Sequence, residues 1–309
     1  VWHLAGNETS CMVGVHSIPI IVDACLKNIQ GIDKERAFKA VRSIEQMNEN
    51  GLDYVRNQGF IPADKVSWSV ARGLEYAVDD YAVAMLAKDL NKEEDYRLFL
   101  KRSKYYTHYF DASLGFMRGK LSDGNWRMNF DPFHSVHLED DYVEGNAWQY
   151  TWLVPHDPEG LIQLFGGKER FVSKLDSLFT VSSELNEGAS IDISGLIGQY
   201  AHGNEPSHHI LYLYAYVGEN EKMARLLRQV YNNFYSTQPD GLIGNPLCNE
   251  ATLKLVNGKE LKIKVKNNSN ENIYIQSVKL NGVEVDSSAI SYQEIMNGGV
   301  LEYEMGKNN

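Results

Sequence analysis

Two short polar stretches, about sixty residues apart, carry the side chains of this sequence that are best suited to chemistry. The first, Glu144 to Trp152, reads Glu-Gly-Asn-Ala-Trp-Gln-Tyr-Thr-Trp, and the second, His202 to His209, reads His-Gly-Asn-Glu-Pro-Ser-His-His. They combine acids, amides, imidazoles and indoles at a density that a core or a solvated surface rarely needs. Aromatic rings beside such groups are typical of a sugar-binding site, in which ring faces stack and polar atoms bind hydroxyls.

Glu144 is the candidate proton donor of the first stretch. We expect Trp148 and Trp152 to flank its carboxyl group and to exclude water from it. Burial of this kind raises the pKa of a carboxyl group, so Glu144 would keep its proton near neutral pH. Taken singly, any one of these residues is more often a surface residue or a packed core residue. The clustering of the two stretches is what favours an active site.

The second stretch is a candidate cation site. Asn204 and Glu205 stand next to Pro206, a residue type that breaks or begins a helix at a fixed backbone angle. Such a turn presents an amide oxygen and a carboxylate together, and a hard cation prefers oxygen ligands. His208 and His209 also have a simpler interpretation, as buried or hydrogen-bonded residues at the start of the helix that follows.

The composition indicates a globular protein and argues against two classes of partner. The chain has 309 residues and is 43% hydrophobic, which allows two domains and a sizeable core. A formal net charge of −11 argues against nucleic acid, which binds to basic surfaces. No window approaches the about 18 consecutive apolar residues of a membrane helix. The three cysteines match no zinc motif, and we expect Cys11 and Cys25 to be small buried residues.

Helical periodicity dominates the first 235 residues. Apolar residues recur every three or four positions, as at Val70, Leu74, Val78 and Tyr81, which indicates amphipathic helices. Helices are predicted at about 17–29, 35–50, 70–86, 92–110, 157–165, 168–180, 191–201, 207–217 and 219–235. Helix pairs in series are typical of an α/α toroid or an α-solenoid. Residues 1–245 are therefore predicted to form a mainly α domain.

Period-two alternation follows Asn245. A run of alternating charged and apolar residues, Glu260 to Val265, follows an Asn-Gly pair, and a second such pair occurs at 281–282. Asn-Gly between alternating stretches is a strong hairpin signal. Residues 246–309 are therefore predicted to form a small antiparallel β module that supports the helical domain.

Four stretches of the chain resemble glycoside hydrolase family 92, the calcium-dependent exo-α-mannosidases. The four stretches are Trp2 to Thr9, Glu139 to Asp157, Tyr200 to His209, and Pro239 to Asn245. The second stretch contains the sequences Glu-Gly-Asn-Ala-Trp-Gln-Tyr and Val-Pro-His-Asp, and the fourth reads Pro-Asp-Gly-Leu-Ile-Gly-Asn. They span most of the chain and follow the family's order. The resemblance implies a mainly α fold of the (α/α)6 toroid type and inverting hydrolysis of terminal α-mannosides, in which bound Ca²⁺ holds the 2- and 3-hydroxyls of the sugar.

The same resemblance implies roles for six residues. Glu144 is the general acid, Asn204 and Glu205 are Ca²⁺ ligands, and His202, Trp148 and Gln149 contact the substrate, a mannose-containing glycan. The expected linkage is of the α-1,2 type, but Gly203 stands where we expect an acidic residue in members selective for that linkage, so the linkage stays open. The family is largely bacterial and exported, which implies a periplasmic or extracellular location.

Two departures from the family bear on activity. Asn245 is followed at once by Pro246, so the block that carries the family's general base is missing between them. The N-terminal β-sandwich and the first toroid helices, expected to pack on the helical domain, are absent ahead of Val1, and we expect a larger protein. Without the base, the chain as written should show no turnover. Two other interpretations stay open: an inactive mannose-binding fragment, and another inverting α/α-toroid glycosidase that needs no calcium.

Overall fold

The computed structural model describes residues 13–235, 249–269, 271–285 and 289–307. The chain divides into two compact units, residues up to Ile210 and residues from Leu211 onward. Several features of the sequence lie outside the described residues: the Trp2 to Thr9 stretch, Cys11, the Pro239 to Asn245 stretch with its junction to Pro246, and Cys248. The predicted domain boundary at 245 therefore stays a prediction.

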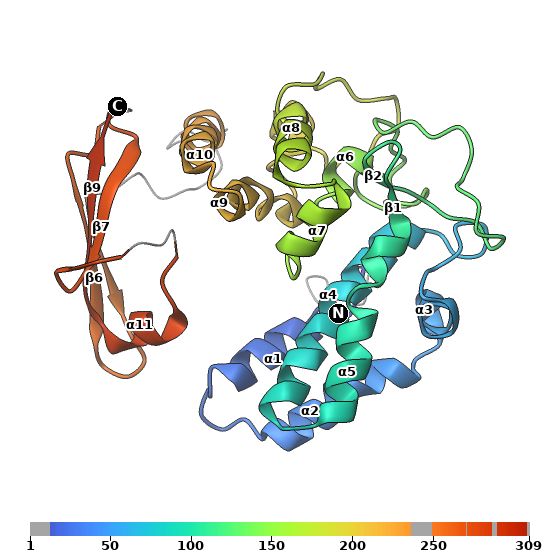
Figure 1. Ribbon diagram of the computed structural model, residues 1–309, viewed down its shortest axis with the longest axis horizontal. Helices are drawn as coiled ribbons and strands as arrows, with labels where there is room; N and C mark the ends of the chain where they lie inside the picture. The colour runs from blue at the N-terminus through green and yellow to red at the C-terminus, as the bar shows by residue number, and fades with distance from the viewer. Residues whose placement is uncertain (1–12, 236–248, 270, 286–288, 308–309) are drawn as a thin grey trace. The chain divides into compact units, whose positions relative to one another are not determined.

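The first unit contains a group of packed helices: α1 (Ser17–Leu26), α2 (Lys34–Arg42), α4 (Ser69–Asp89) and α5 (Glu93–Arg102). The long helix α4 contacts the other three, and Figure 1 shows them side by side. One side chain from each helix illustrates their shared core: Val22, Phe38, Val83 and Phe99 are all buried in it. The helices predicted in this part of the chain are confirmed in type, and Cys25 is buried as expected.

The helix predicted at 35–50 is shorter than expected. It ends at Arg42 and continues as two 3₁₀ turns, Ser43–Gln46 and Glu49–Gly51. Asn50 and Gly51 adopt left-handed backbone angles, with φ of 55° and 87°, which an α-helix cannot contain. A further short helix, α3 (Leu52–Gln58), follows and was not predicted.

The prediction of a helix at 191–201 was wrong. This segment contains a two-stranded hairpin, β3 (Leu196–Ile197) paired with β4 (Tyr200–Ala201). Its turn contains Gly198 at φ +60°, and a Cβ there would lie 2.3 Å from the Leu178 carbonyl oxygen. Apolar spacing suggested a helix, but glycine at this close, left-handed position produces a hairpin instead.

An aromatic core holds the second half of this unit. It contains α6 (Ala147–Tyr150), α7 (Pro158–Leu164), α8 (Lys168–Leu178) and the short strands β1 (Phe110–Asp111) and β2 (Phe116–Met117). The fully buried Trp152 stacks on Phe165 with ring centroids 5.5 Å apart and meets the edge of Phe171 at 5.6 Å. α7 and α8 confirm the predictions at 157–165 and 168–180.

Helix α4 also carries buried charges. Asp80 accepts a hydrogen bond from Arg102 of α5 at 2.9 Å, with both side chains almost fully buried. On the same helix, Glu75 lies 2.7 Å from Nε2 of His16, and Asp79 lies 3.4 Å from its Nδ1. Buried charges are tolerated only when they are paired in this way, so these contacts fix how α4 meets its neighbours.

The second unit combines two helices with a five-stranded sheet. The helices are α9 (Leu213–Tyr216) and α10 (Asn220–Phe234), and the strands are β5 (Glu250–Lys254), β6 (Glu260–Lys266), β7 (Tyr274–Leu280), β8 (Val283–Glu284) and β9 (Gly299–Gly306). Asn281 and Gly282 form the predicted two-residue turn between β7 and β8, with φ of 53° and 81°. The β module is confirmed.

The sheet is mixed rather than antiparallel, which corrects the prediction. Its order is β5-β6-β9-β7-β8, and β9 pairs in parallel with β6. After the β7–β8 hairpin the chain passes through α11 (Tyr292–Asn297) before β9 enters between β6 and β7. A crossover of this length allows a parallel pair, which a tight turn does not.

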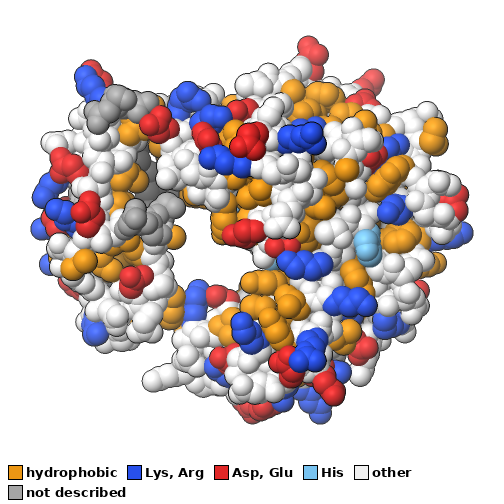
Figure 2. Space-filling model, in the orientation of Figure 1, with side chains coloured by type: hydrophobic (Ala, Val, Ile, Leu, Met, Phe, Trp, Pro, Cys, Tyr) orange, Lys and Arg blue, Asp and Glu red, His pale blue; other side chains and the backbone are white. Residues whose placement is uncertain are grey.

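Charged side chains of both signs are interspersed over the face of the molecule seen in Figure 2. Among the described residues, no helix is both long enough and apolar enough to span a membrane.

The His16 contacts predict a pH-dependent stability. Burial alone would lower the pKa of His16, but the hydrogen bonds that its ring donates to Asp79 and Glu75, and the charges of these two residues, raise it to about 10, from 6.5 in the unfolded chain. The imidazolium therefore stabilises the fold fully below pH 6.5, and this contribution is lost as the pH rises towards 10. The free energy of unfolding of His16→Gln, from urea titrations, should differ most from wild type at or below pH 6.5. A difference independent of pH would contradict this account.

Candidate active site

Glu144 stands at the end of a loop that folds back on itself. The Leu138 N–H donates to the Val143 carbonyl at 2.7 Å, and the Glu144 N–H donates to the Tyr142 carbonyl at 2.7 Å. Val143 has a φ of 60°, which a β-branched residue rarely adopts, and its side chain is buried. Such backbone strain costs on the order of 1–3 kcal/mol and persists only where the surroundings fix it. The loop therefore sets the direction of Glu144 firmly.

Helix α6 begins directly after this loop and is held by a capping box. The Asn146 side chain accepts a hydrogen bond from the Trp148 N–H at 3.0 Å, and the Gln149 side chain accepts one from the Asn146 N–H at 2.7 Å. These reciprocal bonds satisfy N–H groups that a helix start leaves unpaired. A single turn of helix is thereby stable enough to position Tyr150.

Gln199 joins this helix to the second polar stretch. Its side-chain oxygen accepts from Nδ2 of Asn146 at 3.0 Å, and its carbonyl accepts from Nε2 of Gln149 at 2.7 Å. Gln199 is fully buried in the turn between β3 and β4, three residues ahead of His202. We call Asn146, Gln149 and Gln199 the amide cluster. It brings the two stretches that the sequence singled out into contact.

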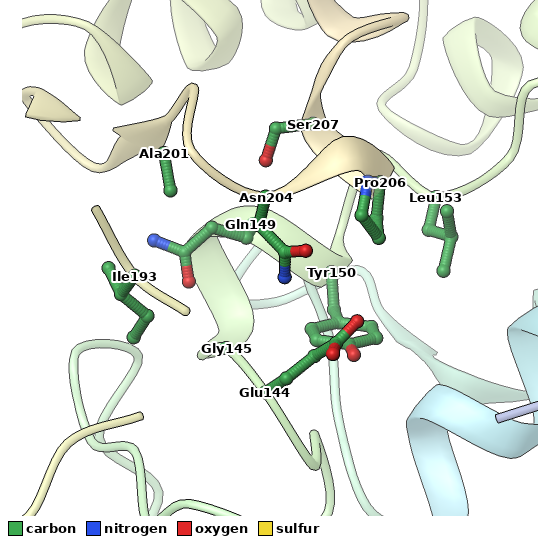
Figure 3. A pocket seen from close by; sticks show the side chains of 10 residues that line it. All are labelled: Glu144, Gly145, Gln149, Tyr150, Leu153, Ile193, Ala201, Asn204, Pro206 and Ser207. Carbon is green, nitrogen blue, oxygen red and sulfur yellow. The ribbon is translucent and has the colours of Figure 1, made fainter. Parts of the chain in front are cut away.

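The two stretches line one pocket, shown in Figure 3. Its lining residues are Glu144, Gly145, Gln149, Tyr150, Leu153, Ile193, Ala201, Asn204, Pro206 and Ser207. In Figure 3 the carboxyl group of Glu144, the ring of Tyr150 and the amide of Asn204 converge. The space open to the centre of a water molecule is about 10 Å³, close to what one water needs. A sugar ring would therefore sit at the mouth, with only a substituent reaching the interior.

Glu144 has the protonation behaviour of an acid catalyst. Burial first, and then the negative charge of Asp192, raise the pKa of its carboxyl group to about 7, although a hydrogen bond from the Asn204 side chain opposes the shift. An exposed glutamic acid would be almost fully ionised at neutral pH. A large fraction of Glu144 therefore keeps its proton there, which is what general acid catalysis requires.

The tryptophans expected to flank Glu144 lie elsewhere. Trp148 meets the edge of Phe116 at 4.8 Å, and Nζ of Lys174 lies 4.5 Å from its ring centroid. Trp152 belongs to the aromatic core. Trp148 and Tyr150 are two positions apart on one helical turn, so they project to nearly opposite sides, and Tyr150 faces the pocket. The expectation that indoles shield Glu144 was therefore wrong.

Gln149 faces the pocket, but its amide group is fully engaged. Its oxygen accepts from the Asn146 N–H, and its nitrogen donates to the carbonyl and to the side-chain oxygen of Gln199, at 2.7 and 3.3 Å. These contacts describe a residue that holds the pocket wall. Its expected contact with substrate stays a prediction.

The histidines of the second stretch bind to one another and to the backbone rather than line the pocket. His202 bonds through Nδ1 to the Tyr200 hydroxyl at 2.8 Å and stacks on His208 with ring centroids 4.7 Å apart. Nε2 of His209 donates to the Trp152 carbonyl at 2.7 Å. Burial lowers the pKa of both His202 and His209, so both rings are neutral at pH 7. His209 supports the simpler interpretation of a buried, hydrogen-bonded residue.

Asn204 and Glu205 offer oxygen atoms to a cation from one turn. Glu205 begins a short 3₁₀ turn, Glu205–Ser207, and its side chain is exposed. In the described ranges, no group of three or more His, Cys, Asp or Glu side chains is arranged to hold a metal ion. A cation at these two residues would need further oxygen ligands, because Ca²⁺ takes six to eight.

Asp192 and Tyr150 belong to this site and were not singled out from the sequence. Asp192 acts on the Glu144 charge and accepts a hydrogen bond from the Ser190 hydroxyl at 3.0 Å. It was assigned to a helix that does not exist, although its place just ahead of the His202 stretch was a usable signal. Tyr150 lies inside the first stretch, between Trp148 and Trp152, the two residues that were predicted to flank Glu144.

Comparisons with known proteins identify the family and the relatives of this chain. A family model for the glycosyl hydrolase family 92 catalytic domain matches residues 1–245 and 242–307, two ranges that overlap at 242–245. A curated relative from Arthroderma benhamiae, described as an uncharacterized secreted glycosidase, is 26% identical over 365 residues. That match covers 95% of this chain and 45% of the relative.

Two solved structures from Bacteroides thetaiotaomicron are similar over nearly the whole chain. One is a family GH92 α-mannosidase in complex with mannoimidazole, 36% identical, with a TM-score of 0.92 over 98% of this chain and 45% of that one. The other is a family GH92 inverting mannosidase, 30% identical, with a TM-score of 0.87 over 99% of this chain and 47% of that one. The chain thus spans about half the length of these relatives.

The likeness to these structures confirms the predicted fold class, a mainly α domain of the family 92 type with a small β module. Because the family model covers almost every residue, this chain belongs to glycosyl hydrolase family 92.

Proposed function

We propose that this chain forms the acid-bearing part of an inverting α-mannosidase, in which Glu144 protonates the glycosidic oxygen of a terminal α-mannoside. The observation that carries the proposal is a carboxyl group with a pKa of about 7 in a pocket of a family 92 fold. The similar Bacteroides enzymes are mannosidases. Since the chain spans about half of their length, the activity belongs to the whole protein.

Glu144 would act on the leaving group. In an inverting glycosidase one carboxylic acid gives its proton to the glycosidic oxygen, and a carboxylate on the other face of the sugar activates water, roughly 6.5 to 9.5 Å away. The fixed loop before Glu144 and the hydrogen bond from Asn204 hold its carboxyl group in one orientation. We place the general base in the block expected between Asn245 and Pro246, which lie outside the described residues.

The substrate would rest at the mouth of the pocket. Leu153, Ile193 and Pro206 supply apolar surface for the carbon atoms of the sugar. His202, neutral and buried, is proposed as a contact of the leaving sugar beside the pocket. The side chains here do not decide the linkage, because Gly203 offers none.

We further propose that the site uses Ca²⁺, held by the amide oxygen of Asn204 and the carboxylate of Glu205. The donors fit this ion, since both are hard oxygen ligands and the neighbouring Asp192 and Glu75 add negative charge. When bound, Ca²⁺ would bind vicinal hydroxyls and favour a distorted sugar ring. Asn204 would then serve two purposes, because its amide nitrogen donates to Glu144 while its oxygen remains free to bind the cation.

We infer an extracellular or periplasmic location for the whole protein. The support is the curated relative, which is described as secreted. A mannose-containing glycan outside the cell would then be the substrate.

Replacing Glu144 by Gln tests the acid. Glutamine keeps the shape of the side chain but has no proton to give, so kcat of the full-length protein on α-linked mannobiose should fall by at least about a hundredfold. Binding of the same disaccharide, measured by calorimetry, should change little. Ser207→Ala is the control, because it changes the pocket wall alone and should keep most of the activity. Asn204→Asp is unsuitable as a control, because it alters the proposed cation site. Equal losses of binding and turnover in Glu144→Gln would point to a structural role.

Removal of calcium tests the cation site. A chelator should abolish turnover by the full-length protein, and added Ca²⁺ should restore it. Glu205→Ala removes one ligand, so it should raise the Ca²⁺ concentration for half-maximal activity by about tenfold or more, since a lost carboxylate ligand weakens a Ca²⁺ site strongly. Direct titration with Ca²⁺ by calorimetry gives the same comparison without turnover. Full activity in chelator would remove the ion from the mechanism.

A further inference from the structure

Tyr150 carries a buried hydroxyl group whose proton has no hydrogen-bond acceptor in the described part of the chain, although the Glu144 backbone N–H interacts with its oxygen. Its side chain is 3% exposed and lines the pocket beside Glu144. Buried polar groups in native proteins are almost always paired, because an unpaired one loses its bonds to water without compensation. A hydroxyl that faces a pocket with its proton unbonded therefore indicates an acceptor that arrives with the ligand.

The neighbouring tyrosine shows what a purely structural hydroxyl looks like here. The Tyr142 hydroxyl donates to the Met117 carbonyl at 2.8 Å, and its ring lies 5.7 Å from that of Tyr150. Both side chains are buried to a similar degree. The two tyrosines thus differ in that, among the described residues, the Tyr142 hydroxyl donates a hydrogen bond and the Tyr150 hydroxyl does not.

The chain makes room for Tyr150 at this position. A Cβ on Gly145 would lie 2.8 Å from the Tyr150 ring, so a side chain there would push the ring away. In Figure 3 the hydroxyl end of the ring lies next to the carboxyl group of Glu144. Burial, and then the negative charge of Glu144, raise the pKa of Tyr150 well above its ordinary value. The hydroxyl therefore keeps its proton and can act as a donor.

We propose that the Tyr150 hydroxyl binds a hydroxyl oxygen of the sugar that leaves, and so makes the site selective for sugar leaving groups. This proposal rests on the proposed function, in which Glu144 touches the glycosidic oxygen. Tyr150 lines the same pocket as Glu144, which in that function acts on the bond to the leaving sugar. The pocket interior has room for one water-sized group, which a single sugar hydroxyl matches and a whole ring does not. The substrate hydroxyl would supply the partner that the protein does not.

The test compares two ligands in a background without turnover. Glu144→Gln and the double variant Glu144→Gln with Tyr150→Phe are titrated with α-linked mannobiose and with methyl α-mannoside, which has no leaving sugar. Loss of one hydrogen bond should weaken mannobiose binding by roughly tenfold and leave methyl α-mannoside binding unchanged. Unchanged mannobiose binding, or equal losses for both ligands, would overturn the proposal.

Tyr142→Phe in the same background is the matched control. It removes a satisfied hydrogen bond, so its melting temperature should fall while the preference for mannobiose stays the same. Tyr150→Phe removes an unsatisfied hydroxyl, so its melting temperature should stay equal or rise. A fall like that of Tyr142→Phe would mean that the Tyr150 hydroxyl has a partner within the protein, and would also overturn the proposal.

Turnover by the protein with Glu144 intact separates this inference from the proposed function. If the protein with Glu144 intact cleaves mannobiose, but Tyr150→Phe does not selectively weaken mannobiose binding, the inference about Tyr150 fails and the proposed function stands. If neither turnover nor binding of any α-mannoside is found, the inference and the proposed function fail together. If mannobiose is bound but not cleaved, the proposed hydrolysis fails, and the binding comparison still decides the role of Tyr150.

Discussion

The site depends on one set of buried hydrogen bonds, those of the amide cluster. Gln199 accepts from Asn146 and Gln149, which stand directly after Glu144, and Gln199 itself lies shortly before Asn204. The bond from His209 to the Trp152 carbonyl joins the same two stretches at their other ends. Buried amides are costly unless their donors and acceptors are paired, so this arrangement excludes alternatives in which the stretches slide past one another. The relation between Glu144 and Asn204 follows from these bonds.

The environment of the pocket also sets the pKa of Glu144. Burial is the main cause of the raised pKa of Glu144, and the negative charge of Asp192 adds to it. A negative charge at this place favours both a proton on Glu144 and the proposed cation at Asn204 and Glu205. The two effects oppose each other, because the charge of a bound cation makes protonation of a nearby carboxyl group less favourable. Asp192 therefore has a clear purpose in this proposal, since it compensates part of the cation's charge and allows Glu144 to remain an acid, whereas Glu75 is paired with His16.

The sequence predicted what depends on local pattern and missed what depends on tertiary contact. Periodicity located α4, and the Asn281-Gly282 pair located the β7–β8 turn. The 191–201 segment has helical spacing, but Gly198 packs against the Leu178 carbonyl and forms a hairpin. The parallel pairing of β6 with β9 depends on a crossover that no local pattern encodes. Glu144 and Asn204 were placed in one site by residue type and clustering. The direction of the Trp148 side chain was not predicted correctly, because it depends on which face of a single helical turn meets the pocket.

Local irregularities indicate function here only where several coincide. Trp68 also has a left-handed φ, of 60°, and its Nε1 has no partner in the described structure, yet it does not line the pocket. The Nε1 groups of Trp148 and Trp152 are likewise unpaired among the described residues, inside aromatic packing. An indole loses little in such a place, since most of its surface is apolar. At the pocket, a strained Val143, a carboxyl group with a raised pKa and an unpaired Tyr150 hydroxyl occur within eight residues. Each of these costs stability on its own. Their coincidence in one pocket is therefore the feature that requires a ligand to explain it.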